Sequence, residues 1–110
     1  AFHSPLMQEA ANEFADALAG ITFAPPRCPV IANVTAQAES DPATLMSLLV
    51  RQLVSPVRWV ESVLHLGGQC EITCCEVGPG SVLQGLVRKI SPELKVIACG
   101  KAEVAEALIA

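Results

Sequence analysis

The stretch EITCCEVGPGSVLQGLVRKI, residues 71–90, decides the expected fold because it joins a strand to a helix through one tight turn. Residues 71–77 carry few charges in their middle, which is typical of a strand covered on both faces. The Gly-Pro-Gly turn at 78–80 follows, and apolar residues then recur at helical spacing as far as residue 90. A further strand over 94–99 and a helix over 101–109 complete this half of the chain.

The first half of the chain continues the alternation of helices and strands. We expect a helix over 6–19, a strand over 30–35, a polar loop over 37–40, a helix over 41–53 and a helix from 55–56 to 67. The serine or aspartate before Pro at positions 4, 41 and 55 marks three of the helix starts. The pattern predicts an α/β fold class, with a short, mostly parallel sheet flanked by helices in a single segment, 1–110.

Composition limits what the chain can bind. Its 110 residues carry a formal net charge of −4 and no cluster of Lys and Arg, which argues against nucleic acid as a partner. No apolar run is long enough to cross a membrane. The five cysteines are expected to be reduced thiols, as in a cytoplasmic protein. The apolar fraction of 52% indicates a surface that meets a partner or a piece of a larger core.

His3 is the strongest candidate for chemistry. It stands directly before Ser4-Pro5, where the serine can cap a helix that begins at the proline. The partial positive charge of a helix N-terminus favours a neutral imidazole, which is the form that acts as a base. A histidine that is merely packed or exposed near the start of the chain is the competing interpretation, and lone histidines are more often of that kind.

The residues alone provide no nucleophile for this base. Ser4 is better explained as a helix cap, and no serine lies in a Gly-x-Ser-x-Gly turn. Ser81 follows the turn at 78–80, where backbone amides could bind an anion, but a cap for the next helix is the simpler explanation. Cys74 and Cys75 are neighbours in a strand and point to opposite faces, so we expect structural thiols and no metal site.

Five blocks of sequence resemble the malonyl-CoA:acyl-carrier-protein transacylases, in the same order and at similar spacings. The acyltransferase domains of fatty-acid and polyketide synthases share the pattern more loosely. Together the blocks span nearly the whole chain, which makes them far more specific than any single motif. They are AFHSPLM (1–7), PVIANVT (29–35), LVRQL (49–53), SPVRW (55–59) and EVGPGSVL (76–83).

The resemblance implies part of an α/β-hydrolase-like large subdomain and a reaction of fatty-acid biosynthesis. Enzymes of this family move a malonyl group from coenzyme A to the phosphopantetheine thiol of acyl carrier protein through an acyl-serine. By resemblance, His3 is the general base that activates the serine. By position alone, Gln52 is a residue on the polar side of its helix. By resemblance, its backbone carbonyl orients His3 and replaces the aspartate of a conventional triad. Malonyl-CoA is implied as a substrate, acyl carrier protein as a partner, and no cofactor as permanently bound.

Three parts of the family's site have no counterpart in these 110 residues. They are the Gly-His-Ser-x-Gly elbow, the arginine that pairs with the malonyl carboxylate and the oxyanion glutamine. We therefore expect the chain to be the C-terminal segment of such an enzyme and to be inactive without the N-terminal part. Two alternatives stay open: an acyltransferase domain of a polyketide synthase, and a small non-catalytic α/β module that binds an anion at the 78–80 turn or docks a protein.

Overall fold

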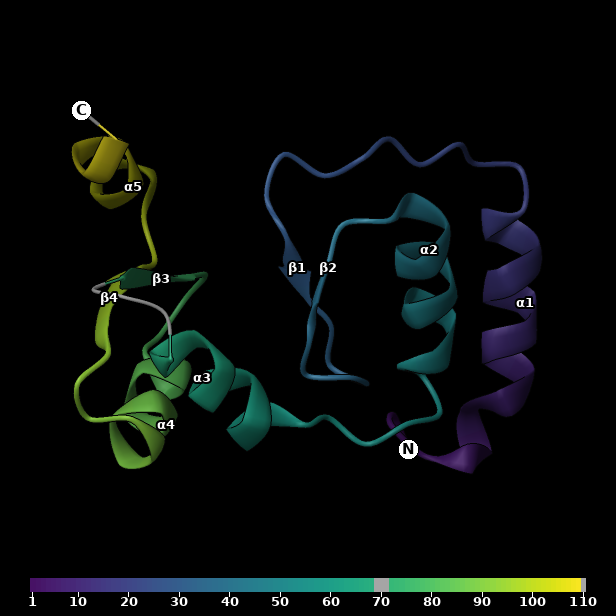
Figure 1. Ribbon diagram of the computed structural model, residues 1–110, viewed down its shortest axis with the longest axis horizontal. Coiled ribbons are helices and arrows are strands. Elements are labelled where there is room, and N and C mark those ends of the chain that lie inside the picture. Colours follow the sequence, from purple (N-terminus) through teal and green to yellow (C-terminus); the bar gives the residue numbers. More distant parts are fainter. Residues whose placement is uncertain (69–71, 110) are drawn as a thin grey trace. The chain divides into compact units, whose positions relative to one another are not determined.

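The computed structural model describes residues 1–68 and 72–109, and the chain divides into two compact units, Ala1–Ser62 and Val63–Ala110. The boundary falls within helix α3 (Trp59–Gly67). The first unit holds the 3-10 helix η1 (Pro5–Met7), α1 (Gln8–Leu18), β1 (Val30–Ile31), β2 (Ala38–Glu39) and α2 (Pro42–Arg51); the second holds β3 (Thr73–Val77), α4 (Val82–Ile90), β4 (Lys95–Cys99) and α5 (Ala102–Ile109), as Figure 1 shows.

Two helices form the core of the first unit. α1 and α2 pack side by side (Figure 1) and bury Ala11, Leu18 and Leu48. Asp41 caps α2 as predicted, since its carboxylate accepts hydrogen bonds from the backbone N–H of Thr44 at 2.8 Å and from the Thr44 hydroxyl at 2.7 Å. The predicted helices over 6–19 and 41–53 are therefore confirmed, with ends shifted by a few residues.

The strand predicted over 30–35 is wrong beyond its first two residues. β1 ends at Ile31, and the chain turns back so that β1 pairs antiparallel with β2, which lies in the stretch predicted to be a polar loop. Ala36, which is buried and has a φ of 55°, closes the turn by donating its N–H to the Ala32 carbonyl at 2.8 Å. The β-branched composition predicted extended backbone, and this hydrogen-bonded turn overrides it.

α3 begins later than the Ser-Pro signal at 55–56 predicted. It starts at Trp59, because the N–H of Arg58 donates to the carbonyl of Asn33 at 2.9 Å and holds the preceding backbone against the β1–β2 turn. Val63 is almost fully buried, whereas Val60 and Leu64 of the same helix are exposed.

The second unit is a strand–helix–strand arrangement. β3 and β4 run parallel, paired from Thr73 with Lys95 to Val77 with Cys99, and α4 connects them. Val87 of α4 and Cys99 of β4 are buried. The first strand of this unit was expected to start at Glu71, which, like Cys70, lies outside the described residues. The predicted helix that ends at residue 90, the strand over 94–99 and the last helix are confirmed.

Two of the predicted serine caps are wrong. Ser4 occupies the N-cap position of η1, but its hydroxyl donates to the carbonyl of Ala1 at 2.7 Å and makes no cap bond. Ser81 likewise makes no cap bond at α4. The carboxylate of Glu76 replaces it, accepting the N–H groups of Leu83 at 2.9 Å and Gln84 at 2.8 Å. A longer acidic side chain from the preceding strand reaches the first turn that the serine was expected to satisfy.

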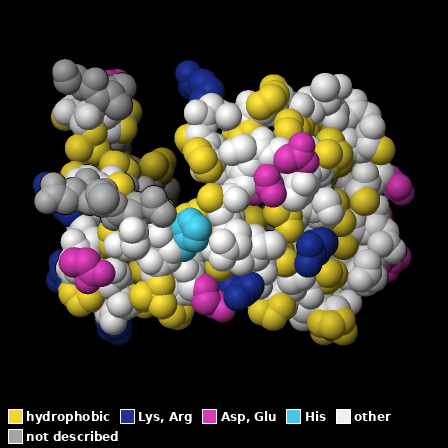
Figure 2. All heavy atoms as spheres, in the orientation of Figure 1, with side chains coloured by type: hydrophobic (Ala, Val, Ile, Leu, Met, Phe, Trp, Pro, Cys, Tyr) yellow, Lys and Arg dark blue, Asp and Glu magenta, His cyan; other side chains and the backbone are white. Residues whose placement is uncertain are grey.

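The α/β class is confirmed, and the expected parallel pairing holds for one of the two small sheets that residues 1–68 and 72–109 form. β3 and β4 are parallel, whereas β1 and β2 are antiparallel. Large apolar side chains reach the surface in both units, with Leu6 and Val77 each 83% exposed, and Figure 2 shows hydrophobic side chains scattered among charged ones. Within the described part of the chain, no helix has the length and apolar character needed to cross a membrane.

Candidate functional site

His3 lies against the C-terminal end of α2. Its backbone N–H donates to the carbonyl of Leu53 at 3.0 Å, and its ring nitrogen Nδ1 lies 2.8 Å from the backbone oxygen of Gln52. Both predicted site residues are therefore neighbours in the folded first unit. The histidine side chain is exposed to solvent, while Gln52 is half-buried. Two hydrogen bonds that His3 donates to adjacent carbonyls fix the residue without enclosing its ring.

The partner of Nδ1 determines which ring nitrogen can act as a base. A carbonyl oxygen only accepts, so Nδ1 carries the hydrogen and donates it to Gln52, which leaves the lone pair of Nε2 free to take a proton. The carbonyl end of a helix also carries partial negative charge, which stabilises positive charge as it develops on the ring. The sequence had suggested an influence from the helix that follows His3; the ring instead contacts the helix end of α2.

The backbone of His3 has an unusual conformation. Its φ is 63°, in the left-handed region that residues with a side chain adopt at a cost of about 1–2 kcal/mol. Such strain persists where the surroundings hold a residue firmly, and it gathers at functional sites. Here the two carbonyls at the end of α2 supply the hold.

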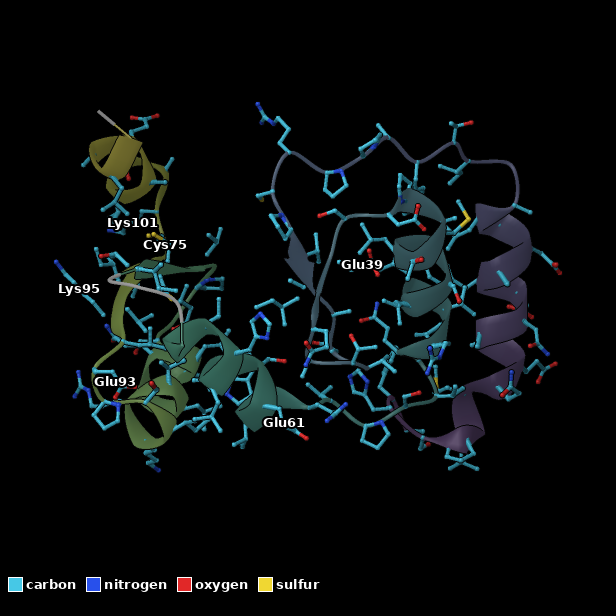
Figure 3. The ribbon with its side chains drawn as sticks, in the orientation of Figure 1. Glu39, Glu61, Cys75, Glu93, Lys95 and Lys101 are labelled. Carbon is cyan, nitrogen blue, oxygen red and sulfur yellow. The ribbon has the colours of Figure 1, made fainter. Side chains whose placement is uncertain are left out.

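Two further residues support this site, and local sequence patterns did not connect either of them with His3 or Gln52. The side-chain amide of Asn33 donates from Nδ2 to Oε1 of Gln52 at 3.3 Å. Arg58 fixes the same turn, since its guanidinium donates to the Thr35 carbonyl at 3.1 Å and forms an ion pair with Glu61 at 3.0 Å; Glu61 lies in the first turn of α3 (Figure 3). The only signal that could have found them is their membership of the 29–35 and 55–59 blocks.

A small apolar cavity adjoins Gln52. Its volume is about 220 Å³, and side chains of β1 and α2 line it together with Asn33 and Gln52. The cavity belongs wholly to the first unit. Asn33 and Gln52 are the polar residues among those that line it, and their side chains are hydrogen-bonded to each other.

The turn before α4 is already occupied by the chain's own carboxylate. Gly78 and Gly80 have φ values of 136° and 93°, which only glycine adopts readily, and they lead into the first turn of α4. Two amides of that first turn, those of Leu83 and Gln84, donate to the carboxylate of Glu76. An external anion at this turn would therefore compete with Glu76 for these two amides.

The described cysteines of the second unit, Cys74, Cys75 and Cys99, are free thiols. Cys74 is half-buried and Cys75 exposed on opposite faces of β3, as the alternation predicts, and Figure 3 marks Cys75 beside that strand. Burial raises the pKa of the Cys74 and Cys99 thiols. Among the residues that the structure describes, no three His, Cys, Asp or Glu side chains gather closely enough to hold a metal ion.

Comparison with known proteins decides which family the five blocks indicate. No protein-family model matches the chain. A malonyl CoA-acyl carrier protein transacylase of Salmonella typhimurium is 46% identical over 88 residues, which are 80% of this chain and 28% of that protein. One of Bacillus subtilis is 40% identical over 108 residues, 98% of this chain and 34% of that protein. This chain is homologous to the malonyl-CoA:acyl-carrier-protein transacylases.

Solved structures of transacylases agree with the sequence comparison. An acyl-carrier-protein S-malonyltransferase from Bartonella henselae superposes with a TM-score of 0.90 at 42% identity, over 98% of this chain and 34% of that one. A malonyl-transacylase in complex with a type II polyketide synthase acyl carrier protein superposes with a TM-score of 0.87 at 38% identity, over 98% of this chain and 35% of that one. The chain thus spans about a third of the length of the acyltransferases it matches.

Proposed function

We propose that this chain is the C-terminal segment of an enzyme that transfers malonyl groups from coenzyme A to acyl carrier protein in fatty-acid biosynthesis. The hydrogen bond between Nδ1 of His3 and the Gln52 carbonyl carries the proposal, because it prepares Nε2 to act as a general base. The names of the relatives support the substrate class. The proposed segment spans residues 1–110 and belongs to an α/β-hydrolase-like subdomain, and the free thiols of the described residues fit a cytoplasmic enzyme.

The proposed reaction uses the same imidazole in both half-reactions. Nε2 of His3 takes the proton of a serine on the N-terminal part of the enzyme, and the serine oxygen attacks the thioester carbonyl of malonyl-CoA. The thiolate of coenzyme A leaves and receives the proton from Nε2. In the second half-reaction Nε2 takes the proton of the phosphopantetheine thiol, whose sulfur attacks the acyl-serine, and the serine oxygen leaves with that proton. Gln52 holds Nδ1–H throughout.

A second candidate function has one observation in its favour. The superposition on a malonyl-transacylase bound to a type II polyketide synthase carrier protein supports a role in polyketide assembly with the same chemistry. A non-catalytic module that binds an anion at the 78–80 turn is disfavoured, because Glu76 already accepts the amides of Leu83 and Gln84.

The test is a chimera in which this chain replaces the matching third of the Bacillus subtilis transacylase, which it covers over 108 residues. We expect the chimera to transfer malonyl from malonyl-CoA to acyl carrier protein and the isolated 110-residue chain to transfer none. Transfer by the isolated chain, or a folded chimera without activity beside an active parent enzyme, would contradict the proposal. Carrier proteins from fatty-acid and polyketide systems, compared by kcat/KM, separate the two candidate functions.

A further inference from the structure

The side chain of Gln52 is hydrogen-bonded to Asn33, which lies in the turn between β1 and β2. Nδ2 of Asn33 donates to Oε1 of Gln52 at 3.3 Å, and both side chains are half-buried next to the apolar cavity. A polar side chain in such surroundings needs a partner, because an unpaired amide loses its hydrogen bonds to water without replacement. The contact ties the last turn of α2 to the turn that follows β1.

Asn33 is itself held in place by independent contacts. Its carbonyl accepts the N–H of Arg58 at 2.9 Å, and the guanidinium of Arg58 donates to the carbonyl of Thr35. The buried residue Ala36, with its hydrogen bond to Ala32, closes the turn on the other side. Asn33 therefore presents its amide from a fixed backbone.

Gln52 lies between this fixed turn and the imidazole. Its backbone N–H donates to the carbonyl of Leu48 at 3.0 Å within the helix. Its side chain accepts a hydrogen bond from Asn33, and its carbonyl accepts one from Nδ1–H of His3. Gln52 is the C-cap of α2, where carbonyls have no helical partner and the chain frays most easily. The bond to Asn33 opposes that fraying at the one peptide that contacts the imidazole.

We propose that Asn33 is a positioning residue that acts through Gln52, holding the Gln52 carbonyl where it fixes the Nδ1–H tautomer of His3. The proposal rests on the proposed role of His3 as general base. Asn33 does not touch the reacting atoms. It increases the fraction of His3 rings in which Nε2 is unprotonated and points at the serine. A loss of this alignment lowers kcat more than it weakens the binding of malonyl-CoA.

Asn33→Leu and Asn33→Asp separate the hydrogen bond from the shape of the side chain. Leu has a similar size but no hydrogen-bond donor. Asp keeps the shape of Asn, and its carboxylate can accept a hydrogen bond from Nε2 of Gln52 once the side-chain amide of Gln52 has rotated by half a turn. In the chimera we expect Asn33→Leu to lower kcat by about 10- to 100-fold with little change in KM. Asn33→Asp is expected to return kcat to within about threefold of the unchanged chimera. Asn12→Leu, at an exposed asparagine of α1, is the matched control and should leave kcat unchanged.

A double-mutant cycle tests whether Asn33 acts through Gln52. Gln52→Leu keeps the backbone carbonyl and removes only the side-chain partner, so it should lower kcat about as much as Asn33→Leu does. The double variant should be no worse than either single variant, since both remove one contact. Losses that multiply in the double variant would overturn the proposal, as would an Asn33→Leu chimera with unchanged kcat.

Nitrogen NMR of His3 in the 110-residue chain gives a readout that needs no activity. In the unchanged chain, Nδ1 should resonate as a protonated nitrogen and Nε2 as an unprotonated one, and Asn33→Leu should shift this ratio toward the Nε2–H tautomer. An unshifted ratio would refute the role of Asn33. If His3→Ala leaves the chimera active, the proposed function fails, while the tautomer ratio still decides the coupling between Asn33 and His3.

Discussion

Nδ1 of His3 and the backbone oxygen of Gln52 lie 2.8 Å apart, although 49 residues separate them along the chain. The contact assigns the ring hydrogen to Nδ1 and turns Nε2 into the free base. An aspartate in this position would add a full negative charge; a carbonyl at the end of a helix supplies a partial one. The arrangement orients the imidazole with the backbone of Gln52, so substitution of that residue's side chain keeps the acceptor and removes only its hydrogen bond to Asn33.

Replacing His3 by Ala in the chimera should lower the rate of malonyl transfer by about 10²–10⁴-fold, because the serine then lacks its general base. Mass spectrometry of the enzyme after mixing with malonyl-CoA measures the loss directly as missing acyl-serine. His65→Ala, at the chain's other histidine in the last turn of α3, is the control and should acylate at the normal rate. An acylation rate unchanged by His3→Ala would contradict the assigned role.

Alanine at Gly80 and at Gly85 should change stability in opposite directions. Gly80 has a φ of 93°, so Gly80→Ala should lower the free energy of unfolding by about 1–2 kcal/mol through backbone strain alone, since no atom lies within 4 Å of the new Cβ. Gly85 lies inside α4, and no atom lies within 4 Å of a Cβ added there. Gly85→Ala should therefore raise the free energy of unfolding by up to about 1 kcal/mol. Urea unfolding of the 110-residue chain measures both. Equal effects of the two substitutions would refute the conformation at Gly80.

The carboxylate of Glu76 should contribute to stability as the cap of α4. Glu76→Ala leaves the N–H groups of Leu83 and Gln84 without their acceptor, and we expect a loss of about 0.5–2 kcal/mol in the free energy of unfolding. Glu76→Gln keeps one oxygen and should lose less. Glu13→Ala, at an exposed position of α1, controls for loss of a negative charge. A Glu76→Ala chain as stable as this control would show that the amides do not depend on the carboxylate.

The pH dependence of stability should contain a contribution from Asp41. The hydroxyl and the backbone N–H of Thr44 both donate to the carboxylate and hold the pKa of Asp41 below its usual value. A lowered pKa in the folded state stabilises the fold above the unfolded pKa, and this stabilisation disappears as the pH falls through the folded value. Below about pH 4, the unchanged chain should therefore lose stability more steeply than Asp41→Asn, whose amide caps without titrating.

Urea titrations of both chains from neutral to acidic pH measure this difference. The pKa of Glu93 is also lowered, by a hydrogen bond from Ser91, but Glu93 is present in both chains and cancels in the comparison. Parallel curves for the two chains over the acidic range would contradict the cap at Asp41.

The sequence alone determined most of the helices, the two parallel strands, the class of the fold and the family. Helical periodicity predicted α1, α2 and α4, the scarcity of charges within 71–77 predicted β3, and Asp41 before Pro42 predicted a cap that the structure contains. These features depend on residues within a few positions of each other, so local propensity and pattern are sufficient. The five blocks gave the homology, although local patterns alone treat Gln52 as a polar surface residue.

The tertiary structure alone decided the contacts that hold the site. Packing brings His3 to Gln52, Asn33 to Gln52 and Glu76 to the first turn of α4, across separations of 49, 19 and up to 8 residues. It also folded residues 30–39 into a hairpin where the β-branched pattern predicted one strand. Each outcome depends on which backbone carbonyl, amide or carboxylate lies within hydrogen-bonding distance once the helices have packed, and no short stretch of sequence encodes that distance.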